Sequence, residues 1–412
     1  MKDLSFLGPG GTGLRNLPAH WTTVPLWSMF ERIKDTGHPE ETMLSVFREY
    51  GVIPKDSREN LNQTAENRNI YQLVHPGWLV VNRMKAWQGS VGISDYRGIV
   101  SGHYICFAPR HNADSKYLNY LLRSETYRDV YRGLSRGVRP GQIEIDNDQL
   151  RKIPIALPPL SEQRAIVDFV DRETAEIDAL IAAQERFIGL LDERRASTIS
   201  TSIERYNESS VHLRYLATIQ SGITLSGEGD PEDPEWPYLR VANVQMGFVD
   251  LDEIKTIRVS HTAAQKARLR VGDVLMTEGG DIDKLGRGAV WYGEIPNALH
   301  QNHIFAARTG PRLDPKFLMY YLDGPTARNY FRVTAKKTTN LASTNKWTTG
   351  SLPVGLPPLD EQHRIVAHLD AETAKIDTLL ETTRRHIALA KERRSALITA
   401  TVTGQIDTRK AV

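Results

Sequence analysis

Only a few short stretches of this sequence carry residues spaced for chemistry, and none of them completes a known site. GPGGTG (8–13) matches the glycine spacing of a dinucleotide-binding turn, but that turn must follow a strand and only seven residues precede it. HQNH (300–303) offers two histidines without a companion at zinc spacing. The acids of GGDIDKLGRG (279–288) could line a calcium loop, although Lys284 and Arg287 within it suit phosphate better.

Other cofactor motifs are missing from the sequence. No Walker sequence for ATP is present, and LPPL lacks the Asp or Asn and the aromatic residue that an amino-methyltransferase motif contains. No Gly-rich turn suits S-adenosylmethionine, and no nucleophile stands in a recognisable pattern with a base. The sequence therefore favours a chain that holds no metal or cofactor and catalyses no reaction itself.

Composition bounds the class of protein. The 412 residues are 40% hydrophobic and 25% charged, which is typical of a globular protein of two to four domains. The single cysteine, Cys106, cannot form an internal disulfide and is expected to be a small buried hydrophobic residue in a reducing compartment. No apolar run is long enough to cross a membrane and no signal peptide is evident, so we expect a cytoplasmic protein.

The net charge of +2 is small, but positive charge is concentrated locally. Residues 110–139 contain seven Lys or Arg against three acids, and residues 328–346 contain five and no acid. Aromatic residues such as Tyr131 and Tyr330 stand among these cations. Basic and aromatic side chains in one tract are typical of a surface that follows phosphates, whereas a solvated helix face is the alternative.

The elements that must position these tracts are revealed by an internal repeat. LPPLSEQRAIVDFVDRETAEIDALI (157–181) returns 199 positions later as LPPLDEQHRIVAHLDAETAKIDTLL (356–380). The period is too long for a solenoid, so it indicates two halves of domain size. In each copy a Pro-Pro pair ends a strand, and Ser161 or Asp360 is placed to cap a following helix.

Apolar residues at mixed spacings of three and four predict that each copy forms a helix of about 40 residues, roughly 60 Å long. Such a one-sided helix must be covered, and its own duplicate can pack against it antiparallel. The alternative is that each helix lies on its own domain. The residues expected in the helix–helix seam are Ile166, Val170, Ile177 and Leu180 of the first copy and Ile365, Leu369, Ile376 and Leu379 of the second.

The segments before the two helices also share landmarks, though less closely. VHPGWLVVNRM (74–84) corresponds to LRVGDVLMTEG (269–279), and DSKYLNYLL (114–122) corresponds to DPKFLMYYL (314–322). Strands with short helices predict an α+β class. We expect a flexible leader at 1–19, a first domain at 20–155, a central spacer helix at 156–205, a second domain at 206–355, and a C-terminal spacer helix and tail at 356–412.

With these repeated helices the chain resembles the specificity subunits of type I restriction–modification systems. NRMKAWQGSVGISDYRGIVS (82–101) and GDVLMTEGGDIDKLGRGAVW (272–291) resemble segments of their target recognition domains. The resemblance implies two α/β target recognition domains separated by two long antiparallel, coiled-coil-like helices, with a pseudo-twofold repeat. It implies that each domain reads one half of a bipartite site in double-stranded DNA, and that the helices fix the gap between the halves.

The resemblance also implies partners and their cofactors. Two methyltransferase subunits, which use S-adenosylmethionine, would dock on the helices, and restriction subunits driven by ATP with Mg²⁺ would cut DNA. Neither chemistry belongs to this chain. Two other classes stay open: an adaptor that displays two protein-binding domains on a helical spacer, and a nuclease or methyltransferase in its own right.

Within this resemblance, the candidates for DNA contact are long polar side chains at exposed tips. Arg and Lys pair with guanine and Asn and Gln with adenine, while many such residues contact only phosphate. In the first domain the candidates are Arg83, Lys85, Gln88, Arg136, Arg139 and Gln142, with Trp87 as a packing or stacking neighbour. In the second domain they are Arg240, Asn243, Gln245, Lys284, Arg287, Lys336, Lys337, Asn340 and Lys346.

Overall fold

The computed structural model describes residues 17–57, 67–137, 143–224, 230–337 and 341–408. The chain divides into two compact units. Unit 1 comprises residues 1–184 and 385–412, and unit 2 comprises residues 185–384. Both long helices are cut by this division, so each unit contains one globular part and half of each helix. Of the expected leader, residues 1–16 lie outside the described residues, and Leu17 packs against the core of unit 1.

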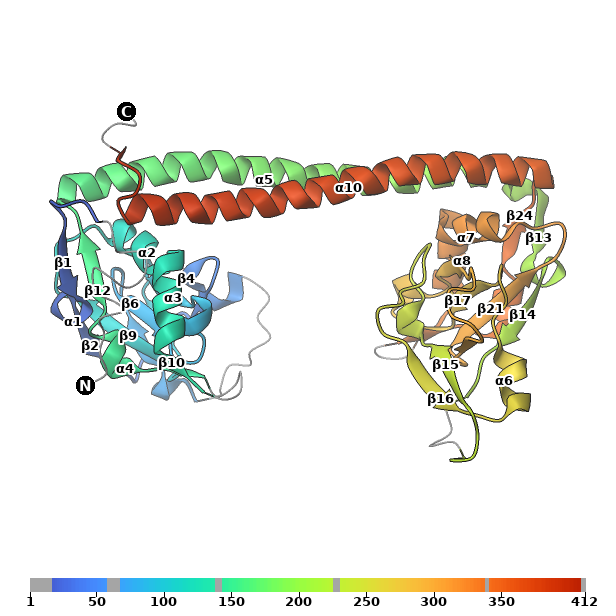
Figure 1. The fold of residues 1–412 in the computed structure, drawn as a ribbon, viewed down its shortest axis with the longest axis horizontal. Helices are drawn as coiled ribbons and strands as arrows, with labels where there is room; N and C mark the ends of the chain where they lie inside the picture. The colour runs from blue at the N-terminus through green and yellow to red at the C-terminus, as the bar shows by residue number, and fades with distance from the viewer. Residues whose placement is uncertain (1–16, 58–66, 138–142, 225–229, 338–340, 409–412) are drawn as a thin grey trace. The chain divides into compact units, whose positions relative to one another are not determined.

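Unit 1 is built on a four-stranded antiparallel sheet in the order β2-β9-β6-β7 (Figure 1). One face, with Leu79 and Phe107, packs against the helices α2 and α3. The other face, with Val80 and Cys106, packs against strands of the hairpin β3–β4 and the pair β5–β8. The bounds of the central elements are β2 Phe30–Ile33, β9 Tyr104–Pro109, β6 Leu79–Asn82, β7 Val91–Ile93, β3 Leu44–Phe47, β4 Gly51–Pro54, β5 Gln72–Val74, β8 Gly98–Val100, α2 Ser115–Arg123 and α3 Glu125–Leu134.

Unit 2 repeats this sheet in the order β14-β21-β17-β19. Val274 and Met276 of its third strand pack against the helices α7 and α8, while Leu275 between them faces a separate core. This alternation is expected of a strand buried on both faces. The bounds are β14 Ala217–Ser221, β21 Ile304–Thr309, β17 Val274–Thr277, β19 Gly288–Val290, α7 Pro315–Asp323 and α8 Pro325–Thr334.

Smaller sheets repeat as well. The first strand of each globular part pairs with the strand that leads into the long helix, and a short hairpin follows the second helix in both units. Among the described residues, the three-stranded sheet β16-β15-β20 occurs in unit 2 and has no counterpart in unit 1. The internal repeat predicted from the sequence is therefore confirmed by the topology. The bounds are β1 Thr22–Pro25 with β12 Pro154–Leu157, β13 Ser210–His212 with β24 Pro353–Gly355, β10 Ser135–Arg136 with β11 Glu144–Ile145, β22 Lys336–Lys337 with β23 Ala342–Ser343, and β16 Lys255–Arg258, β15 Glu235–Leu239 and β20 Leu299–His300.

The repeated segments form the helices α5 (Leu160–Ile203) and α10 (Leu359–Val402), each 44 residues and therefore roughly 65 Å long. In unit 1 the start of α5 shares a core with the end of α10, through Val170 and Val402. In unit 2 the end of α5 shares a core with the start of α10, through Ile203 and Ile365. The helices are therefore antiparallel, as predicted. Each helix also packs on the globular parts, so the helices contact both each other and the two domains.

Leu180 and Leu379 were wrongly placed in the seam. Their side chains are 52% and 43% exposed, whereas the next residues, Ile181 and Leu380, are buried. The buried series in α5 passes through Thr174, whose hydroxyl donates to the carbonyl of Val170 at 2.7 Å and so needs no water. The buried positions 170, 174, 177 and 181 follow spacings of four, three and four residues, so the seam continues at Ile181 and not at Leu180. The other six predicted seam residues are buried.

The repeated EQ of the two signatures ties each helix to the globular part before it. The Gln163 side chain accepts from the backbone N–H of Asp114 at 2.8 Å and donates to the carbonyl of Pro158 at 2.8 Å. Gln362 does the same with the N–H of Asp314 at 2.8 Å. Ser161 and Asp360 are not N-caps, because both helices begin one residue earlier.

Candidate functional site

The first tip of unit 1 is the turn after β6. Asn82 is buried, and its side-chain oxygen accepts from the N–H groups of Met84 at 3.0 Å and Lys85 at 3.1 Å. This local bond turns the chain into the short helix η4 (Ala86–Gln88) and leaves Lys85 and Gln88 exposed, as predicted for DNA-contacting candidates.

The hairpin β10–β11 brings distant residues to the same tip. The N–H of Ile145 donates to the carbonyl of Arg83 at 3.0 Å, and Arg136 lies opposite Glu144. Arg83 forms an ion pair with Glu144 at 2.5 Å, and Arg136 lies 4.0 Å from Asp146. Two arginines thus gather around two acids on the surface.

The remaining candidates of the first domain are Trp87, Arg139 and Gln142. The indole N–H of Trp87 donates to the carbonyl of Met84 at 3.0 Å and its ring is half-buried, so Trp87 packs under the turn. Arg139 and Gln142 lie outside the described residues.

The corresponding tip of unit 2 is a small three-stranded sheet. The strand β18 (Gly279–Gly280) pairs with β23, which pairs with β22. Lys336 and Lys337 of β22 are exposed. Lys284 is the last residue of the short helix η9 (Ile282–Lys284), which follows β18. Lys284 pairs with Asp281 and thereby lowers the pKa of that carboxyl. Asn340 lies outside the described residues.

Arg287 and Gln245 form a pair beside this tip. A guanidinium N–H of Arg287 donates to the side-chain oxygen of Gln245 at 2.9 Å, and the Gln245 amide donates to the carbonyl of Ala242 at 2.8 Å. Both side chains are half-buried. Their orientation is fixed before any partner binds, which suits recognition of a base edge.

Asn243 was wrongly chosen as a base-reading candidate. It is 3% exposed, and its side-chain oxygen accepts from the N–H of Arg240 at 2.8 Å. Its amide donates to the carbonyls of Asp250 at 2.9 Å and Glu253 at 3.1 Å. With both ends of the amide occupied inside the protein, Asn243 holds the loop together. Arg240 pairs with Glu253 at 3.3 Å on the same loop.

Lys346 begins α9 (Lys346–Gly350) and is exposed, beside residues that the sequence reading did not select. Trp347 is 74% exposed, and the guanidinium of Arg214 lies 4.5 Å from the centre of its ring. An exposed tryptophan stacked on an arginine is a ready contact surface. The basic tract AKKTTNLASTNKW ends in Trp347, and this position could have identified the tryptophan as a contact residue from the sequence. Nothing in the sequence connects the distant Arg214 with it.

The structure separates the histidines of HQNH. His300 is buried, one ring nitrogen lies 2.9 Å from the carbonyl of Ile304, and burial lowers its pKa to about 4. His303 is on the surface, 3.0 Å from Glu278. Across the described ranges no three His, Cys, Asp or Glu side chains are grouped to hold a metal ion. Nor does any helix in that part of the chain have the length and apolar character needed to cross a membrane.

Comparison with known proteins identifies related chains. Residues 18–185 match the type I restriction modification DNA specificity domain. The EcoKI specificity subunit of Escherichia coli (strain K12), a type I restriction enzyme component, is 24% identical over 71% of this chain and 66% of its own length. The StySPI specificity subunit of Salmonella potsdam is 22% identical over 88% of this chain and 84% of its own length. This chain thus spans just under two thirds of the first relative.

A solved structure supports the fold of the whole chain. A chain solved in work on complex assembly and conformational transition of the type I R-M system superposes with a TM-score of 0.64. The match covers 95% of this chain and all of the other, at 17% identity. At this identity the likeness concerns the fold, and it includes both globular parts and both long helices.

Proposed function

We propose that this chain, whose residues 18–185 match the type I restriction modification DNA specificity domain, is the DNA-recognition subunit of a type I restriction–modification complex. Each globular part reads one half of a bipartite site in double-stranded DNA. The chain catalyses nothing itself: methyl transfer with S-adenosylmethionine and ATP-driven cleavage with Mg²⁺ belong to partner subunits.

The observation that carries this proposal is one scaffold with two different tips. The N–H of Arg83 donates to the carbonyl of His103 at 2.9 Å, and the N–H of Glu278 donates to the carbonyl of His303 at 2.9 Å. The backbone is the same at these two positions, but one side chain is a cation and the other an anion. Two readers that share a fold and differ at the tip suit two unrelated half-sites.

The proposal is tested by methylation in a defined complex. The purified chain with its cognate methyltransferase subunit and S-adenosylmethionine should methylate DNA at a split site, found by sequencing methylated positions. Combined substitution Lys336→Ala and Lys337→Ala should weaken selection in one half-site, and Lys85→Ala with Gln88→Ala in the other. Methylation by the isolated chain, or selection lost in the same half-site by both variants, would refute the proposal; an adaptor would show no sequence selection at all.

The long helices supply the docking surface for the methyltransferase subunits in this proposal. In unit 1, Leu180 and Leu389 are 52% and 53% exposed; in unit 2, Leu190 and Leu379 are 61% and 43% exposed. Exposed leucines recurring at equivalent positions of a repeat are typical of a surface that a partner covers. Two equivalent surfaces suit two copies of one partner, one on each unit.

A further inference from the structure

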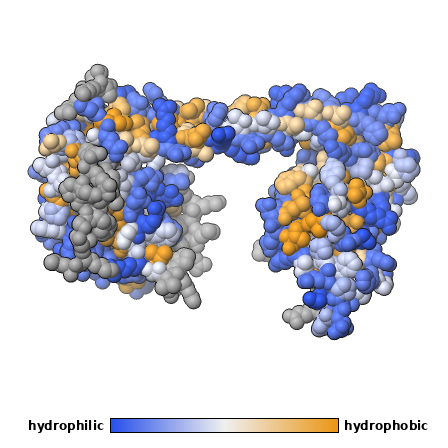
Figure 2. Space-filling view, in the orientation of Figure 1, coloured by the Kyte–Doolittle hydropathy of each residue, from blue (hydrophilic) through white to orange (hydrophobic). Residues whose placement is uncertain are grey.

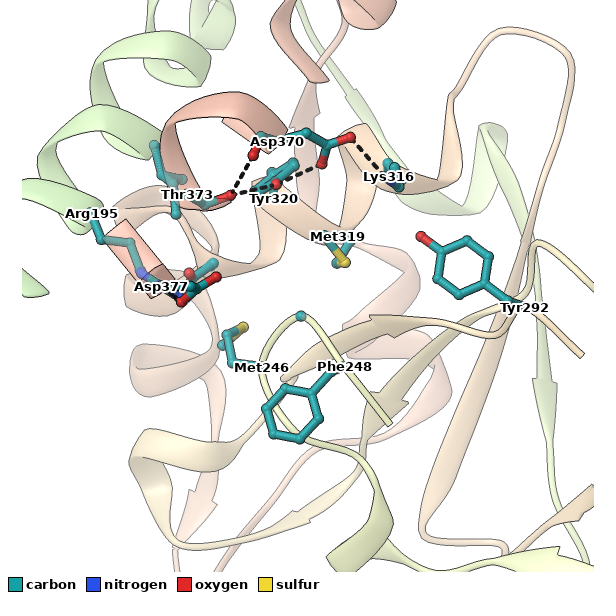
Figure 3. A pocket seen from close by; sticks show the side chains of 13 residues that line it. Arg195, Met246, Phe248, Tyr292, Lys316, Met319, Tyr320, Asp370, Thr373 and Asp377 are labelled. Atoms are coloured by element: carbon teal, nitrogen blue, oxygen red, sulfur yellow. Dashed lines mark hydrogen bonds and ion pairs between the residues drawn. The ribbon is translucent and has the colours of Figure 1, made fainter. Parts of the chain in front are cut away.

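A pocket of about 550 Å³ lies within unit 2, between the long helices and the globular part (Figure 3). One wall is the turn that carries Met246 and Phe248, which the left-handed Gly247 closes; the N–H of Gly247 donates to the carbonyl of Gly288 at 2.8 Å. The opposite wall is formed by α7 and α10, with Met319 and Asp370. The cavity has the size of a ligand site.

Most charges around this pocket already have partners. Asp370 pairs with Lys316 at 2.7 Å and accepts from the hydroxyl of Tyr320 at 2.8 Å, and Asp377 pairs with Arg195 (Figure 3). Asp323 differs: of the residues that the structure describes, none donates a hydrogen bond to its carboxylate. Burial raises the pKa of Asp323, and the nearby charges of Arg328, Arg195 and Arg287 offset this effect only in part.

The equivalent place in unit 1 shows which group fits there. Arg123 ends α2 as Asp323 ends α7. Its guanidinium donates to the carbonyls of Arg48 at 3.2 Å and Glu49 at 2.8 Å, in the turn between β3 and β4, and packs on Gly51. In unit 1 a guanidinium therefore joins the helix end to the neighbouring turn. In unit 2 an acid stands at the helix end, and the space beside it is open.

The rim of the pocket is apolar and exposed. Phe248 is 59% exposed and Tyr292 is 54% exposed. Val271, whose side chain lies beside Gly293, is 73% exposed. Figure 2 shows hydrophobic residues gathered on the surface of this unit. An exposed apolar rim of this kind covers a larger area than a small molecule would contact, and it is typical of a protein-binding surface.

We propose that this pocket binds an arginine side chain of a partner protein, with the guanidinium on Asp323 and an adjoining apolar residue over Phe248 and Tyr292. The partner thereby supplies in unit 2 the group that Arg123 supplies in unit 1. Arginine anchored in a pocket with an apolar surround is the common composition of an interaction hot spot. Because unit 1 fills the equivalent space, each chain has one such site. The inference is independent of DNA recognition.

The chemistry is tested on the full chain with benzylguanidine and its neutral isostere benzylurea, by calorimetry. Benzylguanidine should bind and benzylurea should not. Asp323→Asn should raise the Kd for benzylguanidine at least tenfold, and Asp323→Arg, which copies unit 1, should abolish binding. Asp252→Asn, at an exposed acid away from the pocket, should change nothing. Absence of binding, equal binding of both probes, or an unchanged Kd in folded Asp323→Asn would overturn the proposal.

The partner-protein part is tested with the capped dipeptide acetyl-phenylalanyl-arginine amide. Its aromatic residue should bind the rim, so the dipeptide should bind more tightly than benzylguanidine. Phe248→Ala should weaken binding of the dipeptide at least fivefold and weaken binding of benzylguanidine less, because Phe248 also forms part of the pocket wall. Circular dichroism checks that each variant is folded. If Phe248→Ala weakens both probes equally or neither, the rim does not hold an adjoining residue and the partner-protein assignment fails.

Discussion

Arg83 and Glu144 show how the first tip is prepared for an anion. Both side chains are about half exposed, at 45% and 44%. An exposed ion pair is worth only about 0–1 kcal/mol, so a phosphate can replace Glu144 at little cost. Under the proposed function, the acid holds the guanidinium in place in the free chain and gives way to a phosphate in the complex.

Replacing Glu144 by glutamine should therefore strengthen DNA binding. Glu144→Gln releases Arg83 and removes a negative charge at the tip, so affinity for all DNA sequences should rise and the slope of log K against log salt should steepen by about one. The matched control is Glu31→Gln, because Glu31 pairs with Arg110 at 2.5 Å at the other end of β9. A fluorescence-anisotropy salt titration measures both; an equal gain in the control would show that net charge alone is responsible.

Asn243 and Gln245 lie two residues apart and should respond differently to alanine. Asn243→Ala removes the buried amide that bonds to Arg240, Asp250 and Glu253, so the free energy of unfolding should fall by about 1–3 kcal/mol, with the recognised sequence unchanged. Gln245→Ala should keep stability and weaken discrimination at one base pair by about 1–3 kcal/mol. Thermal unfolding and methylation of a randomised site library separate the two effects. Loss of stability in Gln245→Ala with unchanged selection would assign Gln245 to the loop as well.

At the scale of elements, each long helix has two apolar stripes with different tasks. Ile181 and Leu380 are buried, whereas their neighbours Leu180 and Leu379 are exposed. The inner stripe packs inside the protein, and under the proposed function the outer stripe is the surface that the methyltransferase subunits cover. The Gln163 and Gln362 side chains then fix each helix to its own globular part.

Substitutions in the two stripes should separate folding from assembly. The pair Leu180→Ser and Leu379→Ser should change the stability of the free chain by less than about 0.5 kcal/mol, because exposed substitutions are nearly neutral. It should nevertheless abolish co-purification with the methyltransferase subunit. Ile181→Ser should instead cost about 2–5 kcal/mol of stability. Size-exclusion chromatography with the partner gives the result; intact assembly of the Leu180→Ser and Leu379→Ser chain would remove the outer stripe as the docking surface.

The elements could be predicted from the sequence more fully than the site. The helices and the repeat were found because periodicity and duplication are local signals. The inner stripe was partly missed because Leu180 and Ile181, like Leu379 and Leu380, are a pair of adjacent apolar residues, and apolar spacing alone does not decide which member of each pair is buried. Roles at the tips depend on partners far away in the chain: Arg83 meets Glu144 across 61 positions, and Arg214 stacks on Trp347. No pattern in a single sequence contains such pairs.

At the scale of the whole molecule, the chain contains two complete globular units, each with its own core and tip. They share the topology of the four-stranded sheet, and α5 runs without a break from one unit into the other. Under the proposed function the two long helices set the number of base pairs between the half-sites. The boundary between the units falls after Gln184 in α5 and after Arg384 in α10, so both helices can be lengthened there.

The most direct test of this account is to insert seven residues after Gln184 and seven after Arg384. One heptad in each helix keeps the apolar seam in register and adds roughly 10 Å, which corresponds to about three base pairs of DNA. Insertion into α5 alone should disrupt pairing and abolish activity. The measurement is methylation, with the cognate methyltransferase subunit, of a plasmid library in which the gap length is randomised. The account predicts unchanged half-sites separated by a gap about three base pairs longer; an active double-insertion chain that keeps the original gap would contradict it.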